Sequence, residues 1–434
     1  MSGPLAMTAI GFAGLFALIL MRVPIGVAMG ISGFVGFGIL SGFGPALTLF
    51  GTEPAQVLSN ANLAVVPLFL LMGSLATVSG LSDDIYRLVY AMIGHWPGGL
   101  ACATVGGCAG FGAVCGSSPA TAATMGQIAL PQMLRRGYSP GLATGTIAAG
   151  GTLGMLIPPS IVMVIYAFLA REFVIDIFVA ALLPALLAVV LQVLAIIVYV
   201  RIWPEAAPAG ERIAWRERAR IVRNSWGVVI MIGSVMGGLY SGIFTVNEAA
   251  AVGVLVAFLF AMFRRSLNRR SVIRIVRETA SNTAMIYVII IGASIFTYFV
   301  TATRLPGALT QTFGDMDVPP LVIIVAILAM YVALGCVFDT ISSMVITLPF
   351  VLPVVTGLGY DAIWWGIVLI MVIELGMITP PVGMNVLILH GIDRTIPIGR
   401  IFTGIIPFAI ADLIRIAIIV LFPALALWLP TIVR

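Results

Sequence analysis

Lysine is absent from this 434-residue sequence, histidine occurs only twice, and charged residues make up only 9% of the chain. Without lysine the chain has neither a P-loop for ATP hydrolysis nor a lysine that forms a Schiff base. A zinc site of the HExxH type needs two histidines four residues apart on one helix. The two histidines of this chain, His95 and His390, are far apart in the sequence, so such a site is excluded. A soluble domain has about 25% charged residues and a disordered chain is poor in apolar ones, whereas 61% of this chain is hydrophobic. The composition therefore indicates a protein of the lipid bilayer.

Continuous apolar stretches predict an all-α polytopic membrane protein, because the strands of a membrane barrel alternate apolar and polar side chains. At about 20 residues per crossing, the length allows roughly ten to twelve membrane elements. The first apolar run has no basic segment before it, so we expect a first span there and not a cleaved signal. The net charge of +5 comes from arginines in short loops, which indicates membrane topology and no nucleic-acid partner.

The sequence repeats a pattern of proline, glycine and polar residues. Pro131, Pro158 and Pro159 recur as Pro353, Pro380 and Pro381, at an offset of 222 residues. Residue pairs recur with the same offset: Ser59-Asn60 with Ser281-Asn282, Gly137-Tyr138 with Gly359-Tyr360, and Gly154-Met155 with Gly376-Met377. Matching pairs in one register indicate a duplication. We therefore predict two repeats over 1–205 and 223–434, joined by a cytoplasmic linker or arm over 206–222.

Each repeat is predicted to hold five full spans, one of them a broken helix, and one re-entrant helical hairpin. The hairpins are expected at about 98–135 and 318–357, and the broken helices at 139–170 and 361–390. The other spans are expected at 5–21, 24–43, 60–80 and 176–201, then at 225–242, 245–263, 281–303 and 398–430. Charged amphipathic segments predict helices along the membrane surface at 83–95, 211–223 and 264–278.

The arginines predict the orientation of the chain in the membrane. The loops 201–223 and 264–277 each hold six arginines, which makes them cytoplasmic by the positive-inside rule. With both hairpins re-entrant, 18 arginines lie inside, three lie outside, and Arg415 falls within a span. An odd number of spans per repeat inverts the second repeat relative to the first. Both termini are then outside, and the two hairpins open to opposite faces.

Inverted repeats with interrupted helices are typical of secondary transporters, whose binding sites lie at mid-membrane between the repeats. Proline lacks an N–H and blocks the carbonyl four residues before it, so the Pro-Pro pairs are expected to free the carbonyls of Gly154, Met155, Gly376 and Met377. Carbonyl and hydroxyl oxygens are hard ligands that suit Na⁺. The predicted hairpin tips add hydroxyls and one carboxylate, from Ser117, Ser118 and Thr121, then from Asp339, Thr340, Ser342 and Ser343. The second break adds Thr379 and Asn385.

Some of these residues allow two interpretations. Proline in a membrane helix is often only a kink, although two kinks in register with two polar tips favour a site. Asp339 is a cation ligand, the N-cap of the outgoing helix, or both. Glu374 is a proton or cation site, or the partner of an arginine, and the sequence alone leaves this open. Asp412 and Arg415 are three residues apart and more typical of a structural pair.

Two stretches resemble a known family. GSSPATAATMGQIALPQMLRRGYSPGLATGTIAAGGTLGMLIPPSIVMVIYA (116–167) and ELGMITPPVGMNVLIL (374–389) are similar to the large DctM-like membrane subunit of tripartite ATP-independent periplasmic (TRAP) transporters. The resemblance implies the ion-transporter fold with an elevator-type transport domain, and Na⁺-driven uptake of a C4-dicarboxylate, sialic acid or similar carboxylate. It also implies a bacterial inner-membrane location, a small four-span membrane subunit and a periplasmic binding protein. No organic cofactor and no enzymatic activity are expected.

The family's sodium sites can be carried onto this chain position by position. The first site falls on Ser117, Ser118, Gly151, Thr152, Gly154 and Pro158, and the second on Asp339, Thr340, Ser342, Gly376, Thr379 and Met384. As substrate contacts beside them we predict Thr121, Ser343, Asn385, Pro159 and Pro381. The alternative function is a stand-alone Na⁺/dicarboxylate symporter of the same superfamily. A channel and an intramembrane protease are further alternatives, although the protease would need a pair of facing aspartates that we do not find.

Overall fold

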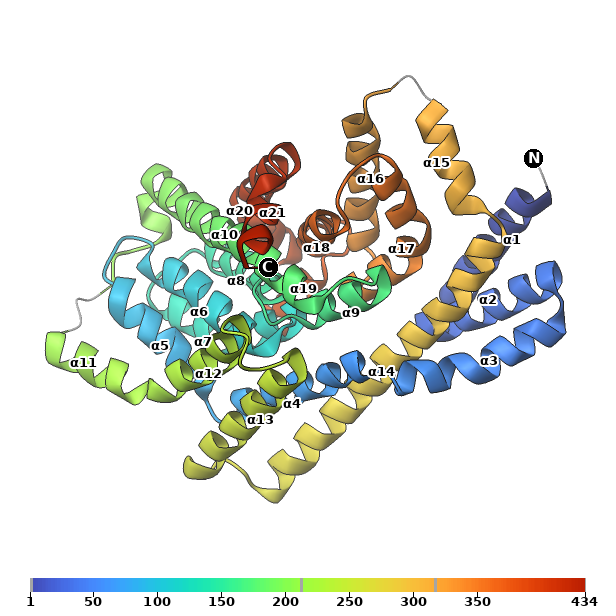
Figure 1. The fold of residues 1–434 in the computed structure, drawn as a ribbon. Coiled ribbons are helices and arrows are strands. Elements are labelled where there is room, and N and C mark those ends of the chain that lie inside the picture. The colour runs from blue at the N-terminus through green and yellow to red at the C-terminus, as the bar shows by residue number, and fades with distance from the viewer. Residues whose placement is uncertain (1–2, 211–213, 316–317, 434) are drawn as a thin grey trace.

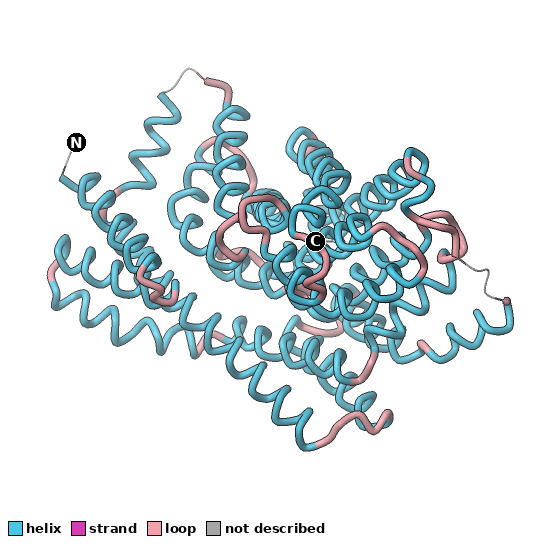
Figure 2. Tube along the Cα trace, turned by 180° about the vertical axis from the view of Figure 1, so that it is seen from behind, coloured by secondary structure: helices cyan, strands magenta, loops and turns pink. Residues whose placement is uncertain are grey.

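The computed structural model describes residues 3–210, 214–315 and 318–433, and this part of the chain is helical, with short loops and no strand (Figure 2). The predicted all-α class is confirmed. Within the predicted linker, residues 211–213 lie outside the described part, and so does Arg434 at the end of the chain.

The described part of the first half of the chain forms ten α-helices and two short 3₁₀ helices, Ala61–Ala64 and Pro204–Ala206. The α-helices are α1 (Gly3–Leu20), α2 (Ile25–Ser41), α3 (Phe43–Leu58), α4 (Val65–Val78), α5 (Leu81–Ile93), α6 (Gly99–Cys115), α7 (Ser118–Arg135), α8 (Pro140–Leu156), α9 (Ile161–Ala170) and α10 (Val174–Ile202). The second half forms α11 (Trp215–Asn224), α12 (Trp226–Tyr240), α13 (Val246–Phe263), α14 (Arg269–Ala302), α15 (Leu305–Asp315), α16 (Pro320–Gly335), α17 (Thr340–Gly357), α18 (Ala362–Ile378), α19 (Met384–Ile392), α20 (Ile398–Leu421) and α21 (Ala424–Val433).

Helix boundaries recur along the chain at the offset found in the sequence. α7 and α8 have the same lengths as α17 and α18, and both helices of the second pair begin 222 residues after those of the first. The turns before α8 and α18 each contain a glycine with positive φ, Gly137 and Gly359, and the Pro158-Pro159 and Pro380-Pro381 bonds are both cis. The helix boundaries thus recur at the offset of 222 residues, and the division into two repeats stays a prediction.

The helices gather into two groups (Figure 1). We call α1–α4 with α12–α14 the outer group, in which the long α14 packs along α2 and α4, and α13 packs on α4. We call α6–α10 with α16–α21 the inner group, in which α6, α7 and α20 surround α8. Nearly every residue of α8 and α18 is buried, as expected for helices that are apolar on all sides.

α8 and α20 approach closely because glycines meet at their crossing. A Cβ atom on Gly404 of α20 would overlap the backbone of Gly141 on α8, and one on Gly145 would overlap the carbonyl group of Gly404. Small residues let membrane helices pack backbone to backbone, which increases the van der Waals contacts between them. These contacts matter in a bilayer because the hydrophobic effect does not drive helices together in lipid.

We expect Gly404→Ala to destabilise the chain by about 1–3 kcal/mol, because the added methyl group overpacks this crossing. Gly399→Ala is the matched control, since Gly399 is on the same helix and its Cβ would have open space. Thermal unfolding in detergent should show a lower Tm for Gly404→Ala alone. Equal Tm values for the two variants would contradict the close crossing.

Several predicted boundaries are wrong. The surface helix expected at 264–278 and the span expected at 281–303 form the single helix α14, because no proline, glycine or cap interrupts the chain between them. In the first repeat Asn60 caps the 3₁₀ helix by accepting the N–H of Asn62, so α3 is a separate helix that we did not predict. The last span ends at Leu421 and not near residue 430, and α21 follows after Pro423.

By length and composition, six helices in the described part of the chain can cross a membrane, or up to eight if two bent pairs each count as one span. One bent pair is α8 with α9, whose axes differ by 43°, at the predicted first break. Five further apolar helices have only 10–17 residues. The predicted ten full spans and the inverted topology therefore stay predictions.

Candidate functional site

The first hairpin tip lies against the first helix break. α6 ends at Cys115 and is followed by Gly116, which has φ 62°, and α7 begins after the extended residue Ser117. A Cβ on Gly154 would lie 2.5 Å from Thr121 Oγ1 and 3.0 Å from the Ser117 carbonyl oxygen, so α8 and the tip are in direct contact there. Gly151 permits the same closeness one turn earlier, where a Cβ would lie 2.8 Å from that of Ala122.

This first tip and break present oxygen atoms with unused lone pairs. The Ser117 side chain makes no capping hydrogen bond, although Ser117 is the N-cap of α7. Pro158 and Pro159 have no N–H to donate to the carbonyls of Gly154 and Met155, as the sequence predicts. Ser160 is fully buried, and its Oγ has no partner among the described residues. Thr152 is also buried, but its hydroxyl donates to the Ala149 carbonyl at 2.7 Å within its own helix.

The second tip lies against the second break in a similar way. The Thr340 hydroxyl donates to Met377 Sδ at 3.0 Å, and Cys336 Sγ lies 3.2 Å from Thr379 Oγ1. Asp339 is the N-cap of α17 and accepts the N–H of Ser342 at 3.3 Å, so the capping role foreseen for it is present. The hydroxyls of Ser342 and Ser343 are buried and have no partner in the described part of the chain.

One predicted free carbonyl is not free. The N–H of Thr379 donates to the Gly376 carbonyl at 3.1 Å, and the Thr379 hydroxyl lies 3.2 Å from the same oxygen. Proline removes only the donor four residues after a carbonyl, whereas at this helix end the donor is three residues later. Met384 is the first residue of α19 and is half-buried.

The two breaks differ in exposure. Pro158 and Pro159 are buried, whereas Pro380 and Pro381 are exposed. The first break is therefore shielded from solvent, whereas the second break is accessible.

Asn385 joins the two repeats. From the sequence we expected Asn385 among the oxygen ligands at the second tip and break. Its Nδ2 instead donates to Ser118 Oγ at 2.9 Å and to the Ala148 carbonyl at 3.0 Å, both in the first predicted repeat. This part of the prediction is wrong because α19 packs across the molecule on α7. Asn385 is fully buried, and its Oδ1 has no partner among the described residues. An unpartnered amide oxygen of Asn385 therefore lies beside the first tip, and not at the second tip as expected.

We expect Asn385→Ala to destabilise the chain by about 1–3 kcal/mol, because it removes the buried amide that donates to both Ser118 Oγ and the Ala148 carbonyl. Asn247→Ala serves as control, since Asn247 makes an exposed hydrogen bond of similar length to the Ala61 carbonyl. Thermal unfolding of both variants checks this, and a loss no greater than that of Asn247→Ala would contradict the cross-repeat contact.

Beside the breaks lies a buried group of charges. Arg415 Nη2 is 3.3 Å from Asp412 Oδ1 on the same helix and 3.6 Å from Glu374 Oε2 on α18. All three side chains are at most 1% exposed. The predicted Asp412–Arg415 pair is confirmed, and Glu374 lies within ion-pair distance of an arginine, which is one of the two roles left open for it. Gln192 of α10, which no sequence motif singled out, is buried and donates to the Ala149 carbonyl at 3.2 Å.

No group of three or more His, Cys, Asp or Glu side chains that could hold a metal ion occurs in 3–210, 214–315 or 318–433. The oxygens gathered at the tips are instead hydroxyls and backbone carbonyls, with Asp339 as the one carboxylate among them. Such neutral oxygens suit a hard monovalent cation better than a transition metal.

Residues 12–425 match the family model described as the tripartite ATP-independent periplasmic transporter, DctM component. The chain belongs to this family. It is similar to the C4-dicarboxylate TRAP transporter large permease protein DctM of Pseudomonas aeruginosa, with 32% identity over 90% of this chain and 93% of that protein. It is also similar to the ectoine TRAP transporter large permease protein TeaC of Halomonas elongata, with 30% identity over 98% of this chain and 99% of that one.

A third relative, the sialic acid TRAP transporter large permease protein SiaM of Vibrio cholerae, is 28% identical over 86% of this chain and 87% of its own. Among solved structures, the YdaH transporter of Alcanivorax borkumensis covers 89% of this chain and 88% of its own with a TM-score of 0.61. At 16% identity this likeness concerns the fold alone. The DctM-family chain is therefore a multi-pass membrane permease subunit and not an enzyme. Its family in general works with a small membrane subunit and a substrate-binding protein.

Proposed function

We propose that this permease imports a small organic acid across the bacterial inner membrane, driven by a Na⁺ gradient and fed by a periplasmic binding protein. The observation that carries the proposal is the pairing of each hairpin tip with a helix break, where buried oxygens lack partners. Relatives named for C4-dicarboxylate, ectoine and sialic acid support a small carboxylate as substrate.

Two sodium ions, one at each tip, would use the oxygens described above. In the first repeat the ligands are Ser117, Ser118, the Gly154 carbonyl and the Asn385 amide oxygen, beside Gly151, Thr152 and Pro158. In the second repeat they are Asp339, Thr340, Ser342 and Thr379, beside Gly376 and Met384. The helices α7 and α17 begin at the tips, and their positive dipole ends favour an anionic substrate beside the cations. Thr121, Ser343, Pro159 and Pro381 stay candidate substrate contacts.

The movement would be of the elevator type. The inner group holds both tips and both breaks, while the outer group includes the long α14 and would be the fixed scaffold. The buried first break and the exposed second break support access from one side at a time. In this proposal both termini face the periplasm, and a separate small four-span subunit completes the complex.

Reconstitution separates this proposal from a stand-alone symporter. Proteoliposomes with the permease, its small subunit and the binding protein should take up substrate only with an inward Na⁺ gradient. Omitting the binding protein should abolish uptake, whereas a stand-alone symporter would still transport free substrate. Uptake that is unchanged when K⁺ replaces Na⁺, or ion conductance without saturation, would contradict the proposal.

A further inference from the structure

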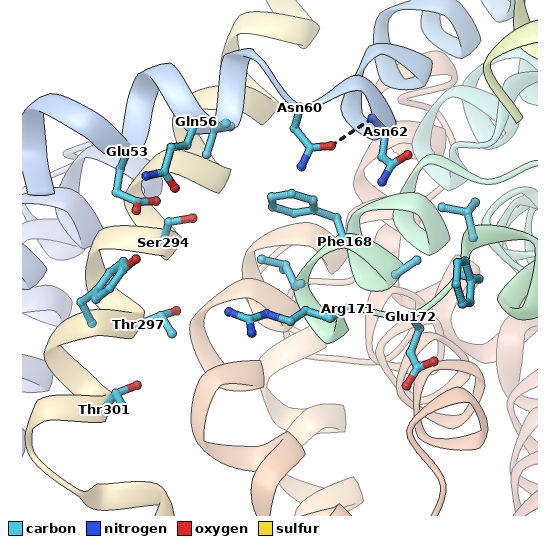
Figure 3. Close-up of a pocket in the computed structure, with 16 residues that line it drawn as sticks. Glu53, Gln56, Asn60, Asn62, Phe168, Arg171, Glu172, Ser294, Thr297 and Thr301 are labelled. Carbon is cyan, nitrogen blue, oxygen red and sulfur yellow. Dashed lines mark hydrogen bonds between the residues drawn. The ribbon is translucent and has the colours of Figure 1, made fainter.

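A cavity of about 720 Å³ lies away from the tips, between the outer group and the end of α9. α3 and α14 form one wall, and the turn between α9 and α10 forms the other (Figure 3). No residue of either hairpin tip or of either helix break lines it. Its volume is typical of sites for small molecules, which lie preferentially between parts of a protein.

Arg171 supplies the positive charge of this cavity. It follows α9 in the left-handed conformation, with φ 59°, and its guanidinium extends toward the side of α14 that carries Thr297 (Figure 3). Arg171 forms no ion pair within the part of the chain that the structure describes. A guanidinium has only donors, in a planar arrangement that matches both oxygens of a carboxylate.

Glu53 supplies a negative charge on the opposite wall. Its side chain is only 5% exposed and points toward Ser294 of α14, next to Gln56 (Figure 3). Tyr298 of α14 lines the same cavity, and no arginine or histidine among the described residues pairs with Glu53. A buried carboxylate has only acceptors, and its burial is costly unless a cation or further donors reach it.

The remaining lining adds a second carboxylate, Glu172, which directly follows Arg171, together with amide groups and an aromatic ring. The amides of Gln56, Asn60 and Asn62 offer both donors and acceptors, and Phe168 adds an aromatic face. A dicarboxylate that placed one end on Arg171 would bring its other negative end toward Glu53. A ligand with a carboxylate at one end and a cationic or hydroxyl group at the other would satisfy both walls.

We propose that this cavity binds a small organic monoacid, with its carboxylate on Arg171 and a cationic or hydroxyl group on Glu53. This inference rests on the proposed function, in which the cavity would be a second site for the transported substrate, apart from the contacts at the tips. It narrows the substrate class because it disfavours C4-dicarboxylates. The cavity lies between the outer and inner groups, so a ligand bound here contacts both parts that move relative to each other in an elevator.

Equilibrium binding to the full chain with its small subunit in lipid nanodiscs tests this inference. The probes are ectoine, which is zwitterionic, sialic acid, which is a hydroxylated monoacid, and succinate, a C4-dicarboxylate. Wild-type protein should bind ectoine or sialic acid at least tenfold more tightly than succinate. Arg171→Gln should weaken that binding at least tenfold, and Glu53→Gln should reduce the discrimination against succinate.

Two matched variants control for folding. Arg304→Gln changes an exposed arginine that also has positive φ but does not line the cavity, and Glu278→Gln changes an exposed glutamate of α14. Both should bind as wild type does. Any one of three results would overturn the inference. Succinate could bind as tightly as the monoacids, the monoacids could fail to bind at millimolar concentration, or Arg171→Gln and Arg304→Gln could have equal effects.

Uptake measured with the same protein variants in proteoliposomes distinguishes failure of this inference from failure of the proposed function. Sodium-driven succinate uptake that is insensitive to Arg171→Gln would overturn the inference and leave the function standing. Monoacid binding that depends on Arg171, without sodium-driven uptake, would overturn the function and leave the binding site standing.

Discussion

Replacing Arg415 with methionine should destabilise the chain by about 3–5 kcal/mol, the usual cost of removing one partner from a buried ion pair. Arg415 is fully buried between Asp412, at 3.3 Å, and Glu374, at 3.6 Å. Without the guanidinium, two carboxylates would remain close together with no cation and no water around them. Thermal unfolding in detergent should show a fall in Tm that exceeds those of the other variants.

The triple variant Arg415→Met/Glu374→Gln/Asp412→Asn should recover most of this loss, because it removes the charges together. Arg201→Met is the exposed control, and its Tm should stay close to that of wild type. If Arg415→Met alone proves as stable as Arg201→Met, then Arg415 does not stabilise the buried carboxylates of Glu374 and Asp412.

Asp339→Ala should raise the Na⁺ concentration for half-maximal uptake at least tenfold, because it removes the one carboxylate from the second tip. Asp361→Ala is a close control. Asp361 is the N-cap of α18, where it accepts the N–H groups of Ile363 and Trp364, and it lies away from the tip. Both substitutions remove a helix cap worth about 1 kcal/mol, so stability should fall alike.

Sodium dependence is what separates the two roles of Asp339. If Asp339 acts only as a cap, the two variants should show the same Na⁺ activation curve as wild type. If it also binds the cation, the curve shifts for Asp339→Ala alone. Uptake assayed over a range of Na⁺ concentrations, with membrane insertion checked for each variant, decides between these results.

Local signals in the sequence predicted where α8 and α18 begin and end. The Pro-Pro pairs mark where α8 and α18 end, since proline cannot continue the hydrogen-bond ladder. Ser139 and Asp361 are good N-caps directly before these helices, and their side chains accept hydrogen bonds as expected of such residues. Both helices also keep the same length in the two repeats, so one repeat is a guide to the other.

Contacts between distant parts of the chain could not be predicted in this way. Asn385 meets Ser118 across 267 residues, and Glu374 meets Arg415 because α18 packs beside α20. Periodicity and composition describe each segment on its own and contain no information on which segments pack together. The continuous α14 was missed for a different reason, because its charged first turns resemble a surface helix although no residue ends the helix there.

Binding of radioactive sodium to the purified chain in nanodiscs tests most directly whether the two tips hold cations. Wild-type protein should bind two ions, and Ser117→Ala and Asp339→Ala should each remove one, while Ser139→Ala, which changes a hydroxyl that caps α8, removes none. If Ser117→Ala and Asp339→Ala both bind as many sodium ions as wild type, the tips and breaks are not the cation sites.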